Sequence, residues 1–323
     1  MRRVWVGVAI AIQLAGLVCA SEAVAEQRYA IILSGASGGQ KYAEQMAEWR
    51  NGLRSALVDR YGFAADKVRV LVDETVKSGE QATAQNVRTT IAAVRKQLTA
   101  EDVLFIVLLG HGTYDGDVAK FNLVGPDLTA AEWSTLLGGL PGRMVIVNTT
   151  EASFPFLQPL SAANRIVITA TDSAAQKYAT VFPEYFVKAL GEASTDIDKN
   201  GRTSIFEVFA TASLAVKQHY DQRGQLTTER ALLDDNGDGV GRESEATGPD
   251  GALARTMYLD AELPAAANNP ELAALLKRRR EIETEAEGLK LKKGSMPAPA
   301  WEAEYEKLML ELAKVSREIK AKS

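Results

Sequence analysis

Five short apolar runs alternate along the chain with segments of helical periodicity, and this alternation constrains the fold more than any other feature. The apolar runs cover residues 29–33, 68–72, 103–109, 144–147 and 165–170. Apolar residues recur every three or four positions in residues 41–60, 83–98, 133–137 and 182–190. Apolar strands that alternate with amphipathic helices are typical of a mostly parallel sheet with helices on both faces. The sequence therefore predicts an α/β fold with three layers.

Two of the predicted strands end in polar loops. Residues 103–109 lead into Gly110-His111-Gly112, and residues 144–147 lead into the run from Asn148 to Ser153. Ligands of open α/β sheets bind at the carboxyl ends of the strands, so these two loops are expected to form a site. The two glycines favour a tight loop that presents His111.

This arrangement resembles the caspase and legumain clan of cysteine peptidases over roughly residues 28–260. In that clan a hydrophobic strand leads into His-Gly, and a later strand leads into a tripeptide like Asp-Ala-Cys. Residues 165–170, Arg-Ile-Val-Ile-Thr-Ala, match a further strand of the clan. The resemblance implies a caspase-like three-layer sandwich, with His111 and Gly112 at the active site and Thr150 at the position of the nucleophile.

The nucleophile position decides what such a chain can catalyse. Cys19 is the single cysteine, and it lies in the N-terminal segment discussed next. A threonine hydroxyl needs a strong and well-placed base, whereas a cysteine is partly thiolate at neutral pH. We therefore predict an inactive peptidase homologue that acts by binding a peptide or protein. Two alternatives stay open: a hydrolase that uses His111 with Thr150 or Ser153, and a calcium-stabilised structural module.

The N-terminus has the pattern of a secretory signal peptide. Met1-Arg2-Arg3 is basic, residues 4–18 are apolar, and Ala23-Val24-Ala25 is a small-residue cleavage signal before Glu26. We expect residues 1–25 to be removed, which leaves no membrane span and places the protein in the periplasm or outside the cell. The net charge of −5 argues against nucleic acid as a partner.

Residues 196–207 have the form of an EF-hand loop, in which oxygen ligands for Ca²⁺ recur at fixed positions. Gly201 stands at the sharp turn. The expected ligands are the side chains of Asp196, Asp198, Asn200, Ser204 and Glu207. The backbone carbonyl of Arg202 is expected to complete the set. This completeness predicts a Ca²⁺ site.

Residues 234–245 look like a second copy, at a spacing close to that of paired EF-hands. Its expected ligands are Asp234, Asn236, Asp238, the carbonyl of Val240, and Glu245. Arg242 and the Gly248-Pro249 pair depart from the pattern, so an Asp/Gly-rich surface turn is the alternative interpretation.

The composition changes after residue 262. Leu275, Ile282 and Leu289 recur every seven residues, and a second run from Trp301 to Ile319 alternates spacings of four and three. We therefore predict a domain over residues 26–262 and an antiparallel helical hairpin over residues 263–323, through which the protein could form oligomers.

Overall fold

The computed structural model describes residues 26–73, 80–176, 178–260 and 269–322. The predicted signal peptide, residues 1–25, lies outside the described residues. Within the described ranges, no helix is both long enough and apolar enough to cross a membrane.

A seven-stranded sheet forms the centre of the fold, in the order β10-β9-β8-β4-β1-β2-β3. Its neighbouring strands pair in parallel, except that β10 runs antiparallel to β9. The strands span Arg28–Ser34 (β1), Val68–Val72 (β2), Glu80–Gln81 (β3), Val103–Leu109 (β4), Arg143–Asn148 (β8), Arg165–Thr169 (β9) and Leu232–Asp234 (β10). Every residue of β1, β4 and β9 is buried, as expected for strands covered on both faces.

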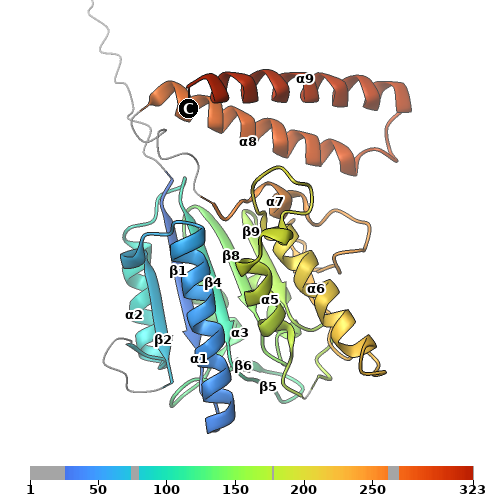
Figure 1. Cartoon of the computed structure of the whole chain (residues 1–323). Coiled ribbons are helices and arrows are strands. Elements are labelled where there is room, and N and C mark those ends of the chain that lie inside the picture. Colours follow the sequence, from blue (N-terminus) through green and yellow to red (C-terminus); the bar gives the residue numbers. More distant parts are fainter. Residues whose placement is uncertain (1–25, 74–79, 177, 261–268, 323) are drawn as a thin grey trace, which may run out of the picture.

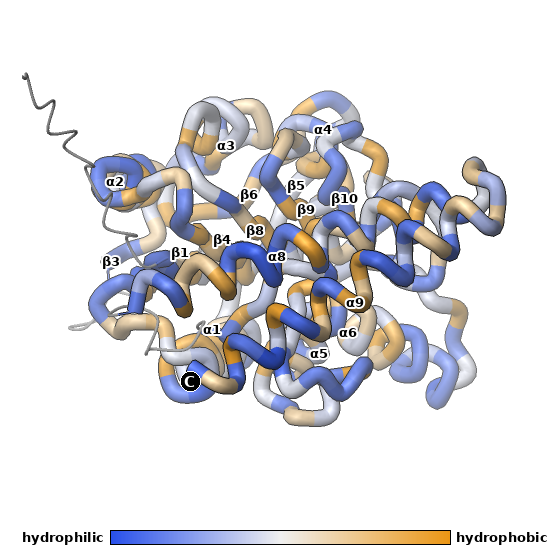
Figure 2. Tube along the Cα trace, turned by 90° about the horizontal axis from the view of Figure 1, so that it is seen from above, coloured by the Kyte–Doolittle hydropathy of each residue, from blue (hydrophilic) through white to orange (hydrophobic). Residues whose placement is uncertain are grey.

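Helices cover both faces of this sheet (Figures 1 and 2). On one face lie α1 (Gln40–Ser55), α5 (Phe182–Gly191), α6 (Ile205–Asp221) and α7 (Ala252–Thr256). On the other lie α2 (Ala84–Arg95), α3 (Ala130–Leu137) and α4 (Leu157–Leu160). Alternate residues of β4 face the two cores, so Phe105 packs with the first group and Leu104 with the second. The predicted three-layer α/β sandwich is confirmed.

A small antiparallel sheet follows β4. It consists of β5 (Gly112–Tyr114), β6 (Ala119–Phe121) and β7 (Leu128–Thr129). Phe121 is fully buried and packs edge-on against Trp133 of α3, which fixes this sheet beside the main core.

The C-terminal segment forms the predicted antiparallel hairpin of α8 (Pro270–Leu291) and α9 (Ala298–Lys322). Ile282, Leu289, Val315 and Ile319 are buried between the two helices. Trp301 stacks on Tyr305, and its indole nitrogen donates to the carbonyl of Leu289, 2.8 Å away. The hairpin therefore has an apolar core of its own.

The hairpin and the candidate active site lie at opposite ends of the sheet. Glu26, just before β1, forms an ion pair with Arg280 of α8 at 2.9 Å, so α8 crosses the amino ends of the strands (Figure 1). Segments 196–204 and 235–250 lie at this same end, because α5 runs back from the carboxyl edge and β10 runs antiparallel to β9. His111 and Thr150 follow the carboxyl ends of β4 and β8.

Candidate functional site

His111 lies in the loop that leaves β4. Gly110 has a φ of 147°, which a residue with a side chain rarely adopts, and this glycine turns the chain out of the strand. The imidazole Nδ1 lies 3.2 Å from Oε1 of Glu151, with 19% of the His111 side chain and 14% of the Glu151 side chain exposed. The hydrogen bond to Glu151 raises the pKa of His111, although burial opposes this effect.

The aromatic ring of Tyr42, on α1, packs edge-on against the His111 ring at 4.7 Å between centroids. Together, the ring contact and the carboxylate hold the imidazole in one orientation. A raised pKa and a carboxylate partner favour the imidazolium form of His111.

Thr150 follows β8 and is completely buried. Its hydroxyl donates to Oδ1 of Asn148 at 2.9 Å, and its backbone N–H donates to the same oxygen at 3.1 Å. The structure brings Thr150 next to Gly112, since a Cβ built on Gly112 would lie 2.7 Å from the Thr150 hydroxyl. Thr150 therefore lies beside the histidine loop, but its hydrogen bond goes to Asn148 and not to His111.

Ser153, the other hydroxyl of this loop, is also completely buried. Its oxygen lies 2.9 Å from the Thr171 hydroxyl and accepts a hydrogen bond from the Thr171 backbone N–H at 3.1 Å. This arrangement ties the loop after β8 to the loop after β9. Neither hydroxyl has the base contact that a nucleophile needs.

The sequence analysis missed Glu151 as the partner of His111. Glu151 directly follows Thr150, and its other oxygen accepts a hydrogen bond from the Gly112 N–H at 3.4 Å. The sequence did contain a signal for this contact, because an acidic residue stands directly after the expected nucleophile, Thr150. The loops after β4 and β8 therefore form a histidine–carboxylate pair, His111 with Glu151.

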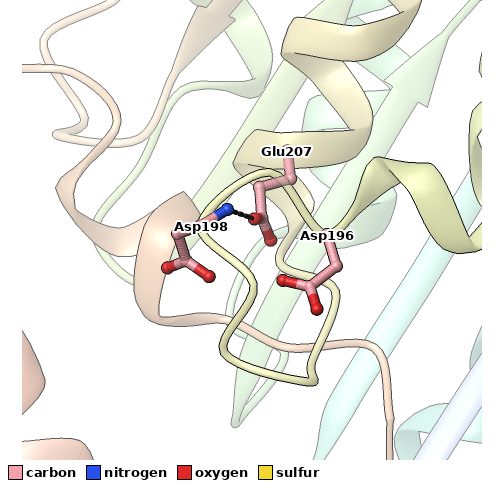
Figure 3. Close-up of side chains that lie close together, drawn as sticks. All are labelled: Asp196, Asp198 and Glu207. Carbon is pink, nitrogen blue, oxygen red and sulfur yellow. Dashed lines mark hydrogen bonds between the residues drawn. The ribbon is translucent and has the colours of Figure 1, made fainter.

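The first predicted calcium loop folds as its pattern requires. Carboxylate oxygens of Asp196, Asp198 and Glu207 lie within 4.8 Å of one another, close enough to share one ion (Figure 3). Asp196 accepts hydrogen bonds from the N–H groups of Asn200 and Gly201, at 3.1 and 2.9 Å. Gly201 adopts a φ of 81°, which makes the sharp turn.

Two of the remaining predicted ligands, Asn200 and Ser204, form hydrogen bonds with these carboxylates. Ser204 caps α6: its hydroxyl donates to Glu207 at 2.8 Å and accepts from the Glu207 N–H at 3.2 Å. Asn200 accepts from the Arg202 N–H at 2.8 Å. The Arg202 side chain turns away from the loop, to Asp260 at 2.8 Å and over the ring of Tyr258.

In the second loop, the carboxylates that lie together are those of Asp234, Asp238 and Asp250. Glu245 is 76% exposed and lies 3.9 Å from Lys217 in an ion pair. Asp250 takes the expected place, because its carboxylate lies within 4.8 Å of those of Asp234 and Asp238. Asp250 lies two residues before α7, which begins at Ala252.

Asn236 and Val240 stay within the turn of the second loop. The Asn236 amide group donates to Asp238 at 3.2 Å, and the Val240 N–H donates to Asp238 at 2.8 Å. Burial, together with the neighbouring carboxylates of Asp235, Asp234 and Asp238, raises the pKa of Asp250 to about 6.

No family model matches the chain. Three metacaspases of Arabidopsis thaliana match part of it: metacaspase-7 is 41% identical over 61 residues, metacaspase-6 is 36% identical over 61, and metacaspase-4 is 40% identical over 57. These matches cover 19%, 19% and 18% of this chain and 15%, 16% and 13% of the metacaspases, so the chain spans about a sixth or less of each relative. The resemblance to the caspase and legumain clan is confirmed over this stretch.

The chain is similar to metacaspases over part of its length, and it folds as a three-layer α/β sandwich around a mostly parallel sheet. Among solved structures it is similar to the protein GSU0716 from Geobacter sulfurreducens, with a TM-score of 0.45 and 14% identity, over 73% of this chain and 100% of the other. It is also similar to caspase-1 from Spodoptera frugiperda, with a TM-score of 0.44 and 12% identity, over 66% of this chain and 87% of the other.

Residues 26–323 contain no cysteine, since Cys19 is the single cysteine of the chain. Its histidine loop is present, and the facing loop supplies Glu151 in contact with that histidine. This pair can bind a polar or charged group and can hold a proton, but by itself it supplies no nucleophile.

Proposed function

We propose that this protein is a caspase-like peptidase homologue without cysteine-peptidase activity, which binds Ca²⁺ and acts by binding a peptide or protein. The observation that carries the proposal is the ion pair between His111 and Glu151, beside a buried Thr150 whose hydroxyl donates to Asn148. A general base must reach the proton that it removes. Here the groups that would form a catalytic pair are bonded to other partners.

The calcium part of the proposal is supported by the first loop. Three carboxylates from Asp196, Asp198 and Glu207 converge within 4.8 Å, and hard oxygen ligands at this density suit Ca²⁺. The loop follows α5 at the amino ends of the strands, whereas His111 follows the carboxyl end of β4. We therefore assign Ca²⁺ a stabilising role in the domain and no contact with the bound peptide.

The binding part of the proposal places the partner at the carboxyl ends of the strands, around His111. Tyr42 is 38% exposed there and lies against the imidazole, so it offers an aromatic surface next to a charged group. Export to the periplasm or to the outside of the cell belongs to the same proposal, and it is supported by the pattern of residues 1–25. Outside the cytoplasm, Ca²⁺ at millimolar levels would fill a weak site.

Two measurements test this function. The purified chain, saturated with Ca²⁺, is incubated with a broad peptide library, and we expect no cleavage above that of the His111→Ala variant. Turnover that His111→Ala abolishes would refute the proposal and favour the hydrolase alternative.

The second measurement follows Ca²⁺ binding by calorimetry. We expect Asp196→Ala and Glu207→Ala to abolish binding at the first loop and the rise in melting temperature that this Ca²⁺ produces, because each removes a carboxylate ligand. Asp115→Ala is the matched control, since Asp115 is an exposed aspartate in another loop. Unchanged binding in both loop variants would show that residues 196–207 are not a site.

A further inference from the structure

Three carboxylates meet at the second loop, although one of them, that of Asp250, lies outside the EF-hand spacing. Asp234 ends β10 and Asp238 lies in the turn that follows, whereas Asp250 arrives from further along the chain, just before α7. One oxygen from each lies within 4.8 Å of the others. Like charges this close repel one another unless a cation lies among them.

Asp250 supplies a second and independent observation. Its side chain is only 4% exposed, and its Oδ2 is buried and accepts no hydrogen bond from any described residue. Oδ2 forms an ion pair with the Arg242 guanidinium, whose Nε lies 3.3 Å away, but the two atoms form no hydrogen bond. A buried carboxylate oxygen without a hydrogen bond is costly, so this oxygen is suited to a metal ion.

The charge at this cluster fits a divalent ion. Three carboxylates facing one guanidinium leave an excess of two negative charges when all are ionised. The ligands are hard oxygens without nitrogen or sulfur, which favours Ca²⁺ over a transition metal.

The backbone around the cluster is already ordered. Asp234 accepts hydrogen bonds from the N–H groups of Gly237 and Gly239, both at 3.0 Å. Both glycines have a positive φ, of 81° and 74°, so the loop wraps around the Asp234 carboxylate. Little conformational entropy remains to be lost when an ion binds.

Asp250 is held in place by contacts of Asp235 with Asp250 itself and with the start of α7. The buried carboxylate of Asp235 accepts from the N–H groups of Gly251 and Ala254, each at 2.8 Å, and so fixes the start of α7. The Asp235 N–H in turn donates to Oδ1 of Asp250 at 3.3 Å. These contacts bring the Asp250 carboxylate to the loop from outside the expected twelve residues.

We propose that Asp234, Asp238 and Asp250 hold a second Ca²⁺, and that Asp250 replaces Glu245 as the residue that closes this site. The site is separate from residues 196–207. The segment that carries Asp250 also pairs with the first loop, since the Leu259 N–H donates to the Thr203 carbonyl at 3.0 Å. The second ion would therefore stabilise residues 250–259, which connect the two loops. Helix α8 packs on α7, which lies within this segment.

Calorimetric titration of the Ca²⁺-free chain with CaCl₂ tests this assignment, with amide NMR shifts of Gly237 and Gly239 to locate the ion. We expect two bound ions in the unmodified protein. Asp250→Asn should weaken the second site by about 10–100-fold, since even residues that only orient a ligand have effects of this size. Glu245→Gln is the matched control and should leave both sites unchanged.

Further variants keep the result interpretable. Asp238 is exposed, so Asp238→Asn should fold normally and should also weaken the second site. Glu207→Gln should remove the first ion. In this variant, addition of Ca²⁺ should still change the NMR shifts of Gly237 and Gly239. The assignment is overturned if Glu245→Gln removes the second ion, or if neither Asp250→Asn nor Asp238→Asn changes the titration. If Ca²⁺ binds at the second loop but not at residues 196–207, the result would count against the proposed function and not against the second site.

Discussion

The ion pair between His111 and Glu151 predicts a pH-dependent contribution to stability that one substitution should remove. Glu151→Gln keeps the size of the side chain and an acceptor for the Gly112 N–H, but it deletes the negative charge. The hydrogen bond to Glu151 is the main cause of the raised pKa of His111, so this pKa should fall in the variant.

The expected size follows from the burial of the pair. A hydrogen bond to a charged group contributes about 1.5–3 kcal/mol, whereas an exposed ion pair contributes about 0.2–1 kcal/mol. The two side chains are 19% and 14% exposed, between these extremes. We therefore expect Glu151→Gln to lower the free energy of unfolding by about 1–2 kcal/mol at acidic pH.

The pH range follows from the direction of the shift. The pKa of His111 is higher in the folded protein than its ordinary value of 6.5. The contribution is therefore fully present below pH 6.5, and it is lost as the pH rises through the folded-state pKa. The difference between the unmodified protein and Glu151→Gln should shrink over that interval.

Denaturant unfolding at a series of pH values measures this difference, and NMR titration of the imidazole signals measures the pKa. The sequence contains two histidines, so His219 serves as an internal control. Burial lowers the pKa of His219, whose Nδ1 lies 2.8 Å from the Tyr185 hydroxyl. The reasoning is refuted if His111 titrates below His219, or if Glu151→Gln has the same effect at every pH.

Three further substitutions test the packing and the site. Gly112→Ala should cost about 1–3 kcal/mol of unfolding free energy, because the new Cβ would lie 2.7 Å from the Thr150 hydroxyl; a neutral result in denaturant unfolding would contradict this packing. Thr150→Cys should give no cleavage of a peptide library, since position 150 is completely buried and its polar atom faces Asn148; measurable turnover would show that substrate reaches it. Thr83→Ala should cost about 1 kcal/mol in the same unfolding assay, because the Thr83 hydroxyl caps α2 by accepting from the Asn86 N–H at 3.2 Å, and an unchanged midpoint would argue against this cap.

The local elements were predictable because their signals lie within a few residues of one another. The apolar runs gave the strands, and the periodic segments gave the helices, with ends within a few residues of those observed. Residues 41–60 were expected to form one helix, and the structure has α1 up to Ser55 followed by a short π-helical turn over Ala56–Arg60. Such a change at a helix end depends on neighbouring packing, here the burial of Leu57 in the core.

The two functional regions were predictable in part. His111, Thr150 and Gly112 do lie together, because parallel strands bring their carboxyl ends to one edge of the sheet. The carboxylates of Asp196, Asp198 and Glu207 lie within 4.8 Å of one another, because a loop of twelve residues with a turning glycine closes on itself.

By itself, the sequence determined the layered α/β fold, the absence of a thiol beyond residue 25, and the local turns of both acidic loops. Tertiary structure decided which side chains face each other across the chain. It paired His111 with Glu151 and brought Asp250 to the second loop in place of Glu245. It also placed both acidic loops at the amino ends of the strands, whereas His111 follows the carboxyl end of β4. These contacts depend on the path of the whole backbone, because residues far apart in sequence become neighbours through the sheet order and the direction of β10.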